Sequence, residues 1–219
     1  MHQQFSLRLA ELLISRLCHD LVTPVGAINT GLELFQETSP GHLTETQEIL
    51  NLILHSAQTA SARLSLFRVA FGYSGARISL GEARQILENY FIRSKIEFQW
   101  KEPFQKNLTL EGWGRLLLNT VLWVSECAPR GGVLHISPPK EENLILSLRL
   151  RADPIILHKG TVEALEGRSS LEDLTPRSVP CYLIHCLVKE NKGKLSLHSS
   201  STLSELVLEV EGGVSDPSS

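Results

Sequence analysis

The chain opens with a long run in which apolar residues recur every three or four positions. This is the spacing of a helix that buries one stripe of its surface. The stripe consists of Leu13, Leu17, Leu21, Val25, Ile28, Leu32 and Phe35. The pattern predicts a helix that ends before the Thr-Ser-Pro-Gly turn at residues 38–41.

A second run with the same spacing follows that turn. Its apolar positions are Ile49, Ile53, Ala57, Ala60, Leu64, Phe67 and Phe71. Two helices of about thirty residues joined by a short turn form an antiparallel hairpin. Because one hairpin cannot cover its own apolar stripe, we expect two copies of the chain to pair into a dimeric four-helix bundle.

The pattern changes after residues 72–79, a small and polar segment typical of a hinge. Beyond it we expect helices at 80–91, 110–127 and 180–191, and strands at 96–100, 133–137, 144–150, 194–198 and 205–210. Helices mixed with antiparallel strands indicate an α+β sandwich. We therefore predict a helical hairpin domain at 1–73, an α+β domain at 78–212, and a frayed tail over residues 212–219.

Composition narrows the classes of function. A length of 219 residues with 42% hydrophobic content allows one large domain or two small ones. The net charge is -3 with both signs interspersed, so we expect no nucleic-acid partner. The first residues lack a charged segment followed by a long apolar core, and no uninterrupted apolar run reaches the roughly 18 residues of a membrane span. We expect a cytoplasmic protein without membrane contact.

The four cysteines, Cys18, Cys127, Cys181 and Cys186, form no Cys-x-x-Cys pair, and the histidines are not spaced as zinc ligands. We interpret all four as reduced thiols and expect neither a disulfide nor a metal site.

The candidate chemistry lies in the stretch from Cys18 to Val25, where His19 directly precedes Asp20. At roughly 100° per residue His19 lies about 160° from the apolar stripe, so it faces outward. Gly26, seven residues on at nearly the same azimuth, leaves little bulk beside it. Another protein's backbone therefore has room to approach, and His19 is a candidate phosphate acceptor.

Pro24 falls inside the helical pattern, where it removes one backbone hydrogen bond and crowds the carbonyl of Asp20. Either the helix kinks beside His19, or it ends near Val22 and restarts after the proline. A proline in mid-helix costs about 3 kcal/mol, and Gly26 adds roughly 1 kcal/mol relative to alanine. We infer that something other than local stability maintains both residues.

The run from His19 to Pro24 resembles the phosphoacceptor motif of dimerising histidine-kinase bundles, a His-Asp or His-Glu pair followed by Thr-Pro or Asn-Pro. The hairpin and the α+β segment also follow one another in the order found in those kinases. The resemblance spans nearly the whole chain and implies that the second domain is built like a kinase ATP-binding domain.

That second domain lacks the groups that hold a nucleotide. Trp123 occupies the position where the resemblance places a Mg²⁺-binding asparagine. An indole N–H is only a donor and cannot bind Mg²⁺. Asn119 lies one turn earlier and does not replace the missing ligand. Asp153 is followed by Pro154 rather than by the Asp-x-Gly-x-Gly of an adenine site. Ser178–Cys181 replaces the glycine-rich turn that cradles phosphate. We predict that ATP binding is lost.

The chain combines a kinase-like bundle with a second domain that lacks nucleotide-binding groups. This combination and the segment Arg63–Gly72 resemble the ChpT-type histidine phosphotransferases. The resemblance implies a phosphorelay intermediate rather than an ATP-dependent kinase. It would accept a phosphoryl group on His19 from the receiver domain of a hybrid histidine kinase and pass it to the receivers of response regulators. It also implies a homodimer with no cofactor of its own, since the partner receiver supplies Mg²⁺.

A neutral imidazole carries a free lone pair on one ring nitrogen, so His19 is the expected nucleophile. Asp20 would accept a hydrogen bond from the other nitrogen. The residues expected to touch a docking receiver are Arg16, Val22, Thr23, Gly26, Arg63 and Arg68. For the three arginines a solvated surface charge is the alternative.

Two competing functions stay open at this point. One is an ATP-dependent sensor histidine kinase with a divergent nucleotide site, and the other is a non-catalytic dimerisation scaffold in which the His-Asp pair is incidental. We interpret six of the other histidines as structural; they are His42, His55, His135, His158, His185 and His198.

Overall fold

The chain is described by a computed structural model that covers residues 2–39, 42–72, 77–92, 94–102, 105, 107–200, 202 and 204–212, with side chains from residue 7 onward. The predicted hinge at 72–79 and the predicted tail at 212–219 lie in large part outside these described residues, at 73–76 and 213–219.

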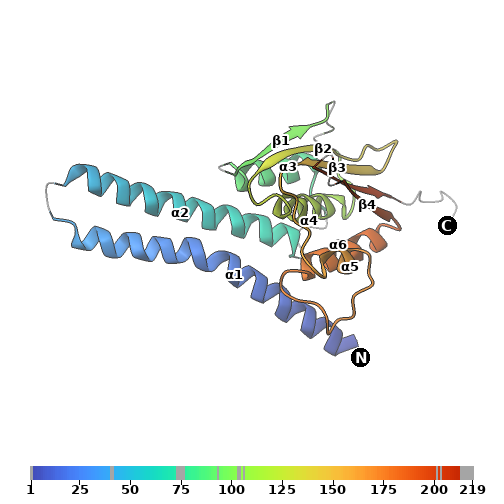
Figure 1. Cartoon of the computed structure of the whole chain (residues 1–219), viewed down its shortest axis with the longest axis horizontal. Coiled ribbons are helices and arrows are strands. Elements are labelled where there is room, and N and C mark those ends of the chain that lie inside the picture. Colours follow the sequence, from blue (N-terminus) through green and yellow to red (C-terminus); the bar gives the residue numbers. More distant parts are fainter. Residues whose placement is uncertain are drawn as a thin grey trace.

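Two long antiparallel helices, α1 (His2–Glu37) and α2 (Leu43–Ala70), form the predicted hairpin (Figure 1). Helix α1 runs without a break through Pro24, which is buried, so the alternative that it ends near Val22 is wrong. The two helices approach closely at Gly31, where a Cβ atom would lie 2.6 Å from Cγ1 of Ile53. Packing along the hairpin therefore offsets the local cost of the proline.

The hairpin leaves much of its apolar surface open. Of the predicted stripe on α1, Leu13, Leu17, Leu21 and Ile28 are half-buried. Val25, Leu32 and Phe35 stay 46%, 46% and 44% exposed, because the tightest packing on α1 is made by Leu12, Pro24 and Gly31 instead. A pairing of two hairpins would cover this surface, and that pairing stays a prediction.

The rest of the chain folds as a five-stranded sheet with helices. Its elements are α3 (Leu80–Tyr90), β1 (Ile96–Trp100), α4 (Trp113–Glu126), β2 (Gly132–Ser137), β3 (Ile145–Arg151), α5 (Thr161–Leu165), α6 (Val179–Glu190), β4 (Lys194–Ser200) and β5 (Glu205–Glu211). The predicted helices and strands are all present, and the short helix α5 was not predicted. An α+β architecture is therefore confirmed.

The strand order is β1-β2-β3-β5-β4. The expectation of antiparallel strands holds for three of the four pairings, while β1 and β2 run parallel. The exception arises because α4 lies between β1 and β2 in the chain and returns it to the same end of the sheet, which is the geometry of a crossover connection.

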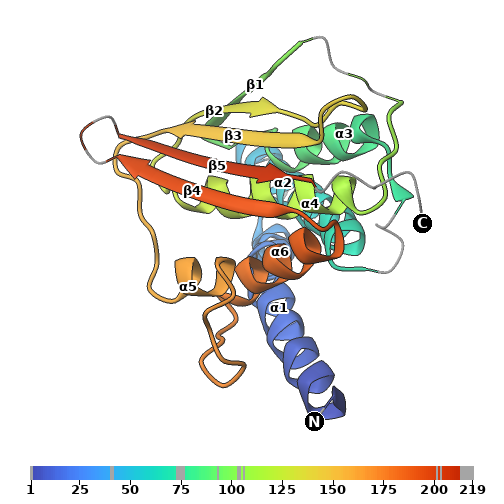
Figure 2. The ribbon, with the colours of Figure 1, turned by 90° about the vertical axis from the view of Figure 1, so that its right-hand side faces the viewer.

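One face of the sheet packs on helices and the other faces solvent, giving two layers (Figure 2). The buried strand positions alternate; they are Leu134, Ile136, Leu146, Leu148, Leu150, Leu206, Leu208 and Val210. Helix α4 lies beneath the sheet and is buried along almost its whole length. This layer holds the C-terminal end of α4 in a fixed place.

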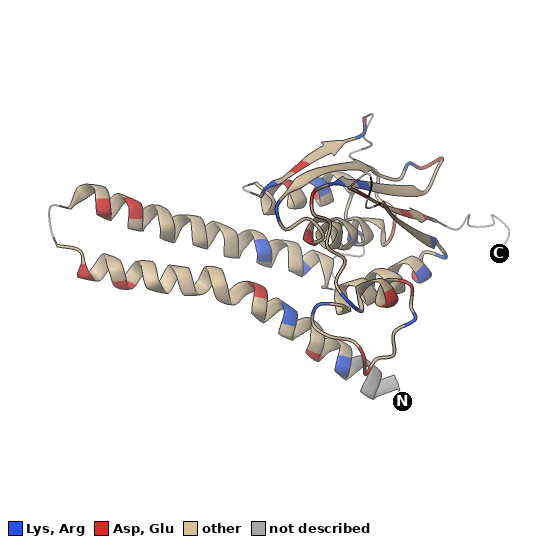
Figure 3. Cartoon of the chain, in the orientation of Figure 1, with Lys and Arg blue, Asp and Glu red and all other residues tan. Residues whose placement is uncertain are grey.

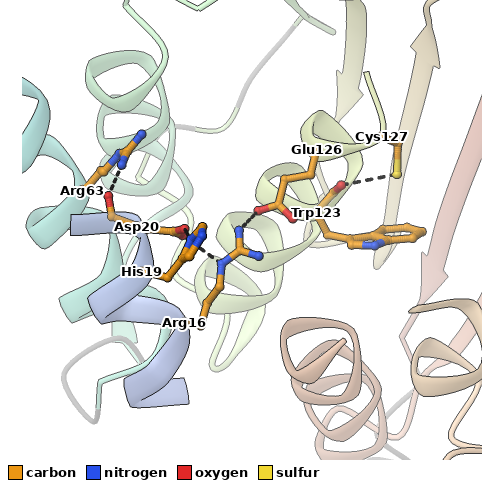
Figure 4. Close-up of polar contacts among 7 residues, drawn as sticks. All are labelled: Arg16, His19, Asp20, Arg63, Trp123, Glu126 and Cys127. Carbon is orange, nitrogen blue, oxygen red and sulfur yellow. Dashed lines mark hydrogen bonds and ion pairs between the residues drawn. The ribbon is translucent and has the colours of Figure 1, made fainter. Parts of the chain in front are cut away.

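The hairpin is anchored to that layer through the last turns of α2. Leu66, Phe67 and Ala70 are buried in the same apolar core as α4. The side chain of Asn119 on α4 donates to the backbone carbonyl of Ala70 at 3.0 Å and to that of Arg115 at 2.8 Å. The end of α4 consequently lies beside the middle of α1, where His19 is found (Figure 4).

Candidate functional site

His19 lies on α1 with its side chain 85% exposed, which confirms that it faces outward. Its Nδ1 atom lies 3.1 Å from Oδ1 of Asp20 (Figure 4). An ionised carboxylate only accepts hydrogen bonds, so this contact requires the proton on Nδ1. The lone pair then resides on Nε2, the nitrogen that no protein group among the described residues engages.

Asp20 is held much more tightly than the histidine it contacts. Its side chain is only 15% exposed, and its second carboxylate oxygen, Oδ2, accepts a hydrogen bond from Nε of Arg16 at 2.8 Å. The two oxygens of one carboxylate therefore serve two different partners. Asp20 can fix the histidine tautomer because its own position is fixed.

Arg16 in turn reaches the second domain, where its Nη2 donates to Oε1 of Glu126, the last residue of α4. Burial lowers the pKa of Arg16, but the charges of Glu126 and Asp20 outweigh it and leave that pKa above its ordinary value. Burial raises the pKa of Glu126, and Asp20 adds to this while Arg16 opposes it. A solvated helix charge is thus the wrong description of Arg16; its predicted contact with a receiver stays a prediction.

Arg63, on α2, donates from Nη1 to the backbone carbonyl of Asp20. That carbonyl would receive the N–H of the residue four positions on, which is Pro24 and has none. The guanidinium therefore replaces the missing helix hydrogen bond. Arg63 is half-buried rather than an exposed rim charge, whereas Arg68 is exposed.

The other predicted docking residues lie on the open surface of α1 just past His19. Val22 is 68% exposed, and Thr23 and Gly26 are exposed as well. A Cβ atom on Gly26 would meet no heavy atom within 4 Å. The surface beside the histidine is thus unobstructed, while contact of these residues with a receiver stays a prediction.

The sequence interpretation missed two members of this cluster, Glu126 and Tyr90. Burial raises the pKa of Tyr90 to about 12, and the charges of Arg63, Asp20, Glu126 and Arg16 all act on it. Tyr90 also lines both hollows beside the cluster, an open groove of about 670 Å³ between α2 and α3 and a smaller one of about 220 Å³ toward α4. One signal was available: Glu126 and Arg115 are the only charged residues in α4.

The second domain uses its polar groups for packing at the positions where the kinase resemblance places nucleotide contacts. Trp123 is 3% exposed, and Asn119 is 1% exposed with its side-chain amide nitrogen donating to two backbone carbonyls. Helix α6 has Pro180 in its first turn, which removes one of the amides that a helix N-terminus offers to phosphate. These features favour the predicted loss of ATP binding.

Within the described ranges no three histidine, cysteine or acidic side chains gather as metal ligands do. Nor is any helix in that part of the chain long and apolar enough to span a membrane.

Comparison with known proteins identifies the family of this chain. The family model described as "Histidine phosphotransferase C-terminal domain" matches residues 80–202. The chain is 34% identical over 205 residues to the protein phosphotransferase ChpT of Brucella abortus (strain 2308), covering 90% of this chain and 92% of that protein. The chain belongs to the histidine phosphotransferase family. The predicted resemblance to ChpT-type phosphotransferases is therefore confirmed.

A solved structure of a bacterial phosphotransferase matches this histidine phosphotransferase with a TM-score of 0.80 and 32% identity, covering 94% of this chain and 96% of that one. The match extends over both the hairpin and the α+β part. The function is phosphoryl transfer within a phosphorelay, and the alternative of an ATP-dependent kinase has less support.

Proposed function

We propose that His19 carries the phosphoryl group, which it accepts from a receiver aspartate of a hybrid histidine kinase and passes to the receivers of response regulators. The observation that carries this proposal is the pairing of an 85% exposed imidazole with a fixed carboxylate on its Nδ1. Nε2 is left with its lone pair on the side of solvent, where a visiting aspartyl phosphate can be attacked.

In the forward step Nε2 of His19 forms a bond to phosphorus while the bond from phosphorus to the receiver's carboxylate oxygen breaks. The receiver aspartate leaves as a free carboxylate. The positive charge that develops on the ring is stabilised by Asp20 through Nδ1–H. Transfer onward reverses these bonds, with the aspartate of the next receiver as the nucleophile. Phosphoryl transfer depends mainly on alignment and charge neutralisation, and the receiver supplies the Mg²⁺.

The docking surface in this proposal is the exposed part of α1 around Val22, Thr23 and Gly26, and it includes the exposed Arg68 on α2. A backbone can approach His19 closely over Gly26, since no atom lies where its Cβ would be. This explains why residues that weaken an isolated helix occupy the segment after the histidine. Arg16 and Arg63 contribute to the proposal by holding Asp20.

The proposal includes a homodimer formed through the hairpin. Among the described residues, twelve of the fifteen large apolar side chains that remain exposed lie on α1 or α2. No charged residue occurs between Asp20 and Glu33 on α1 or between Glu48 and Arg63 on α2 (Figure 3). A long uncharged apolar face of this kind is typical of a helix bundle that is completed by a partner.

The proposed function is tested by offering the protein two phosphoryl donors separately, labelled ATP and a receiver domain already phosphorylated on its aspartate. We expect label from the receiver and none from ATP. Label from ATP would favour the kinase alternative, and the scaffold alternative predicts label from neither.

The His19→Gln variant should accept no label. The matched control is His42→Gln, because His42 is also an exposed hairpin histidine with a carboxylate near Nδ1, Glu45 at 3.2 Å. His42 lies at the far end of the hairpin, beside the turn. We expect the control to accept label at the wild-type rate, and an equal loss in both variants would contradict the assignment of His19.

A further inference from the structure

The two carboxylate oxygens of Asp20 contact different partners, Oδ1 the ring of His19 and Oδ2 the guanidinium of Arg16. A free guanidinium beside a carboxylate prefers to bind both oxygens at once through two parallel hydrogen bonds. Arg16 instead gives Asp20 only its Nε, at 2.8 Å from Oδ2. Oδ1 therefore remains available to Nδ1 of His19 at 3.1 Å.

Glu126 accounts for this one-sided contact. Its carboxylate accepts a hydrogen bond from Nη2 of Arg16. Nε and Nη2 are the two donors that an arginine would use to grip a single carboxylate along that edge. With one of them on Glu126, the guanidinium bridges two carboxylates instead of closing on one (Figure 4).

The bridge lies in partly buried surroundings. The side chains of Arg16 and Asp20 are each 15% exposed and that of Glu126 is 30% exposed. Charged hydrogen bonds in such places are stronger and more directional than on the open surface, so the geometry is well defined. His19, which contacts the other oxygen of Asp20, is exposed.

We propose that Glu126 is a positioning residue for phosphoryl transfer: by holding Arg16 across the domain junction, it keeps Asp20 turned toward His19 and so fixes which ring nitrogen carries the lone pair. The inference rests on His19 being the phosphoryl carrier. It goes beyond that assignment because it makes the reactivity of a histidine on the hairpin depend on a residue at the end of α4, whose contact with Arg16 joins residues 110 positions apart in the sequence.

The proposal gives the second domain a role that needs no nucleotide. Helix α4 is fixed beneath the sheet, and its last residue completes the chain of contacts that ends at the phosphoacceptor. Any movement of this domain relative to the hairpin would release Arg16, let it close on Asp20, and withdraw the carboxylate from the ring.

The test uses the full-length variants Glu126→Gln and Glu126→Ala, with Glu88→Gln as the matched control. Glu88 also accepts from an arginine Nε, that of Arg84 at 2.7 Å, and it lies outside the cluster. We expect Glu126→Gln to slow transfer from a phosphorylated receiver on the order of 10-fold, a coupling of ordinary size for contacting charged groups. Glu126→Ala should slow it at least as much, and Glu88→Gln should leave it unchanged.

A double-mutant cycle separates positioning from a direct or purely structural role. If Glu126 acts through Asp20, Glu126→Gln should add no further slowing in the Asp20→Asn background. Slowing by the same factor in both backgrounds, or no slowing in either, would overturn the proposal. Thermal unfolding of each variant checks that the fold is retained.

Nitrogen NMR of the unphosphorylated protein gives a readout that needs no transfer at all. We expect the Nδ1–H tautomer of His19 to dominate in the wild type and in Glu88→Gln, and to lose population in both Glu126 variants. Unchanged tautomers in those variants would refute the inference. Failure of the wild type to accept label would instead refute the proposed function, so the two failures are distinguishable.

Discussion

The guanidinium of Arg63 on α2 donates a hydrogen bond to the backbone carbonyl of Asp20 on α1. This is the carbonyl that Pro24 leaves without a helix donor. We expect Arg63→Met to destabilise the protein by about 1–3 kcal/mol, the cost of leaving a shielded acceptor unsatisfied. The free energy of unfolding measured with urea checks this value.

The variant Pro24→Ala should make the stability of the protein depend less on Arg63. An alanine restores an N–H to the Asp20 carbonyl, so Arg63→Met should cost clearly less in the Pro24→Ala background than in the wild type. Arg8→Met serves as the control, since the ion pair of Arg8 with Glu11 is exposed and should contribute little. Equal costs of Arg63→Met in both backgrounds would show that its role lies elsewhere.

A second prediction concerns the carboxylate itself. Asp20→Asn keeps the shape of the side chain but removes the charge that stabilises the phosphorylated ring. We expect transfer from a phosphorylated receiver to slow by a factor of ~10² to 10⁴, the range for lost acid-base assistance. Single-turnover labelling measures the rate, and a wild-type rate would remove Asp20 from the mechanism.

The hairpin and the exposed histidine could be predicted from sequence because both depend on local periodicity. Seven apolar residues at helical spacing place His19 on the opposite face, and its 85% exposure agrees with that. The same reasoning could not decide the effect of Pro24, because the outcome depends on tertiary contacts. Burial of Pro24 and the hydrogen bond from Arg63 are formed across the hairpin.

The contact partners of Glu126 and Tyr90 could not be predicted for a related reason. Glu126 meets Arg16 across 110 residues, and no pattern within α4 indicates which end of the helix lies beside the hairpin. The short helix α5 escaped prediction because five residues span little more than one turn and show no periodicity. The parallel pairing of β1 with β2 likewise follows from the path of α4, which strand patterns do not specify.

Two glycines of α1 should respond in opposite ways to the same substitution. At Gly26 a Cβ meets open space, so Gly26→Ala should stabilise the helix by up to roughly 1 kcal/mol. At Gly31 a Cβ would lie 2.6 Å from Ile53, so Gly31→Ala should destabilise by about 1–3 kcal/mol through overpacking. Thermal unfolding distinguishes the two signs.

If a receiver docks closely over Gly26, the stabilised Gly26→Ala variant should nevertheless transfer phosphoryl more slowly. Gain of stability with loss of transfer is the pattern expected of a residue kept for partner access. A variant that is more stable and transfers at the wild-type rate would place the docking surface away from Gly26.

The open apolar face of the hairpin predicts that charged substitutions on this face will prevent dimer formation. Leu32 and Leu54 are 46% and 57% exposed in the single chain. If a partner covers them, the double variant Leu32→Glu/Leu54→Glu should dissociate to monomers, since it would bury unpaired carboxylates. Light scattering measures the mass, and Gln47→Glu, at an exposed polar position, should remain dimeric.

The raised pKa of Tyr90 makes stability fall at alkaline pH. Burial shifts it from the ordinary value of 10 to about 12, so the folded protein keeps a proton that the unfolded chain releases between those values. The resulting stabilisation is complete below pH 10 and is lost as the pH rises toward 12. By pH 11 the loss should amount to about 1 kcal/mol.

The Tyr90→Phe variant has no such proton to retain, so its free energy of unfolding should decline less steeply over this range than that of the wild type. Identical slopes for the two proteins would show that the Tyr90 hydroxyl titrates normally in the fold, and would place it outside the shielded cluster around Asp20.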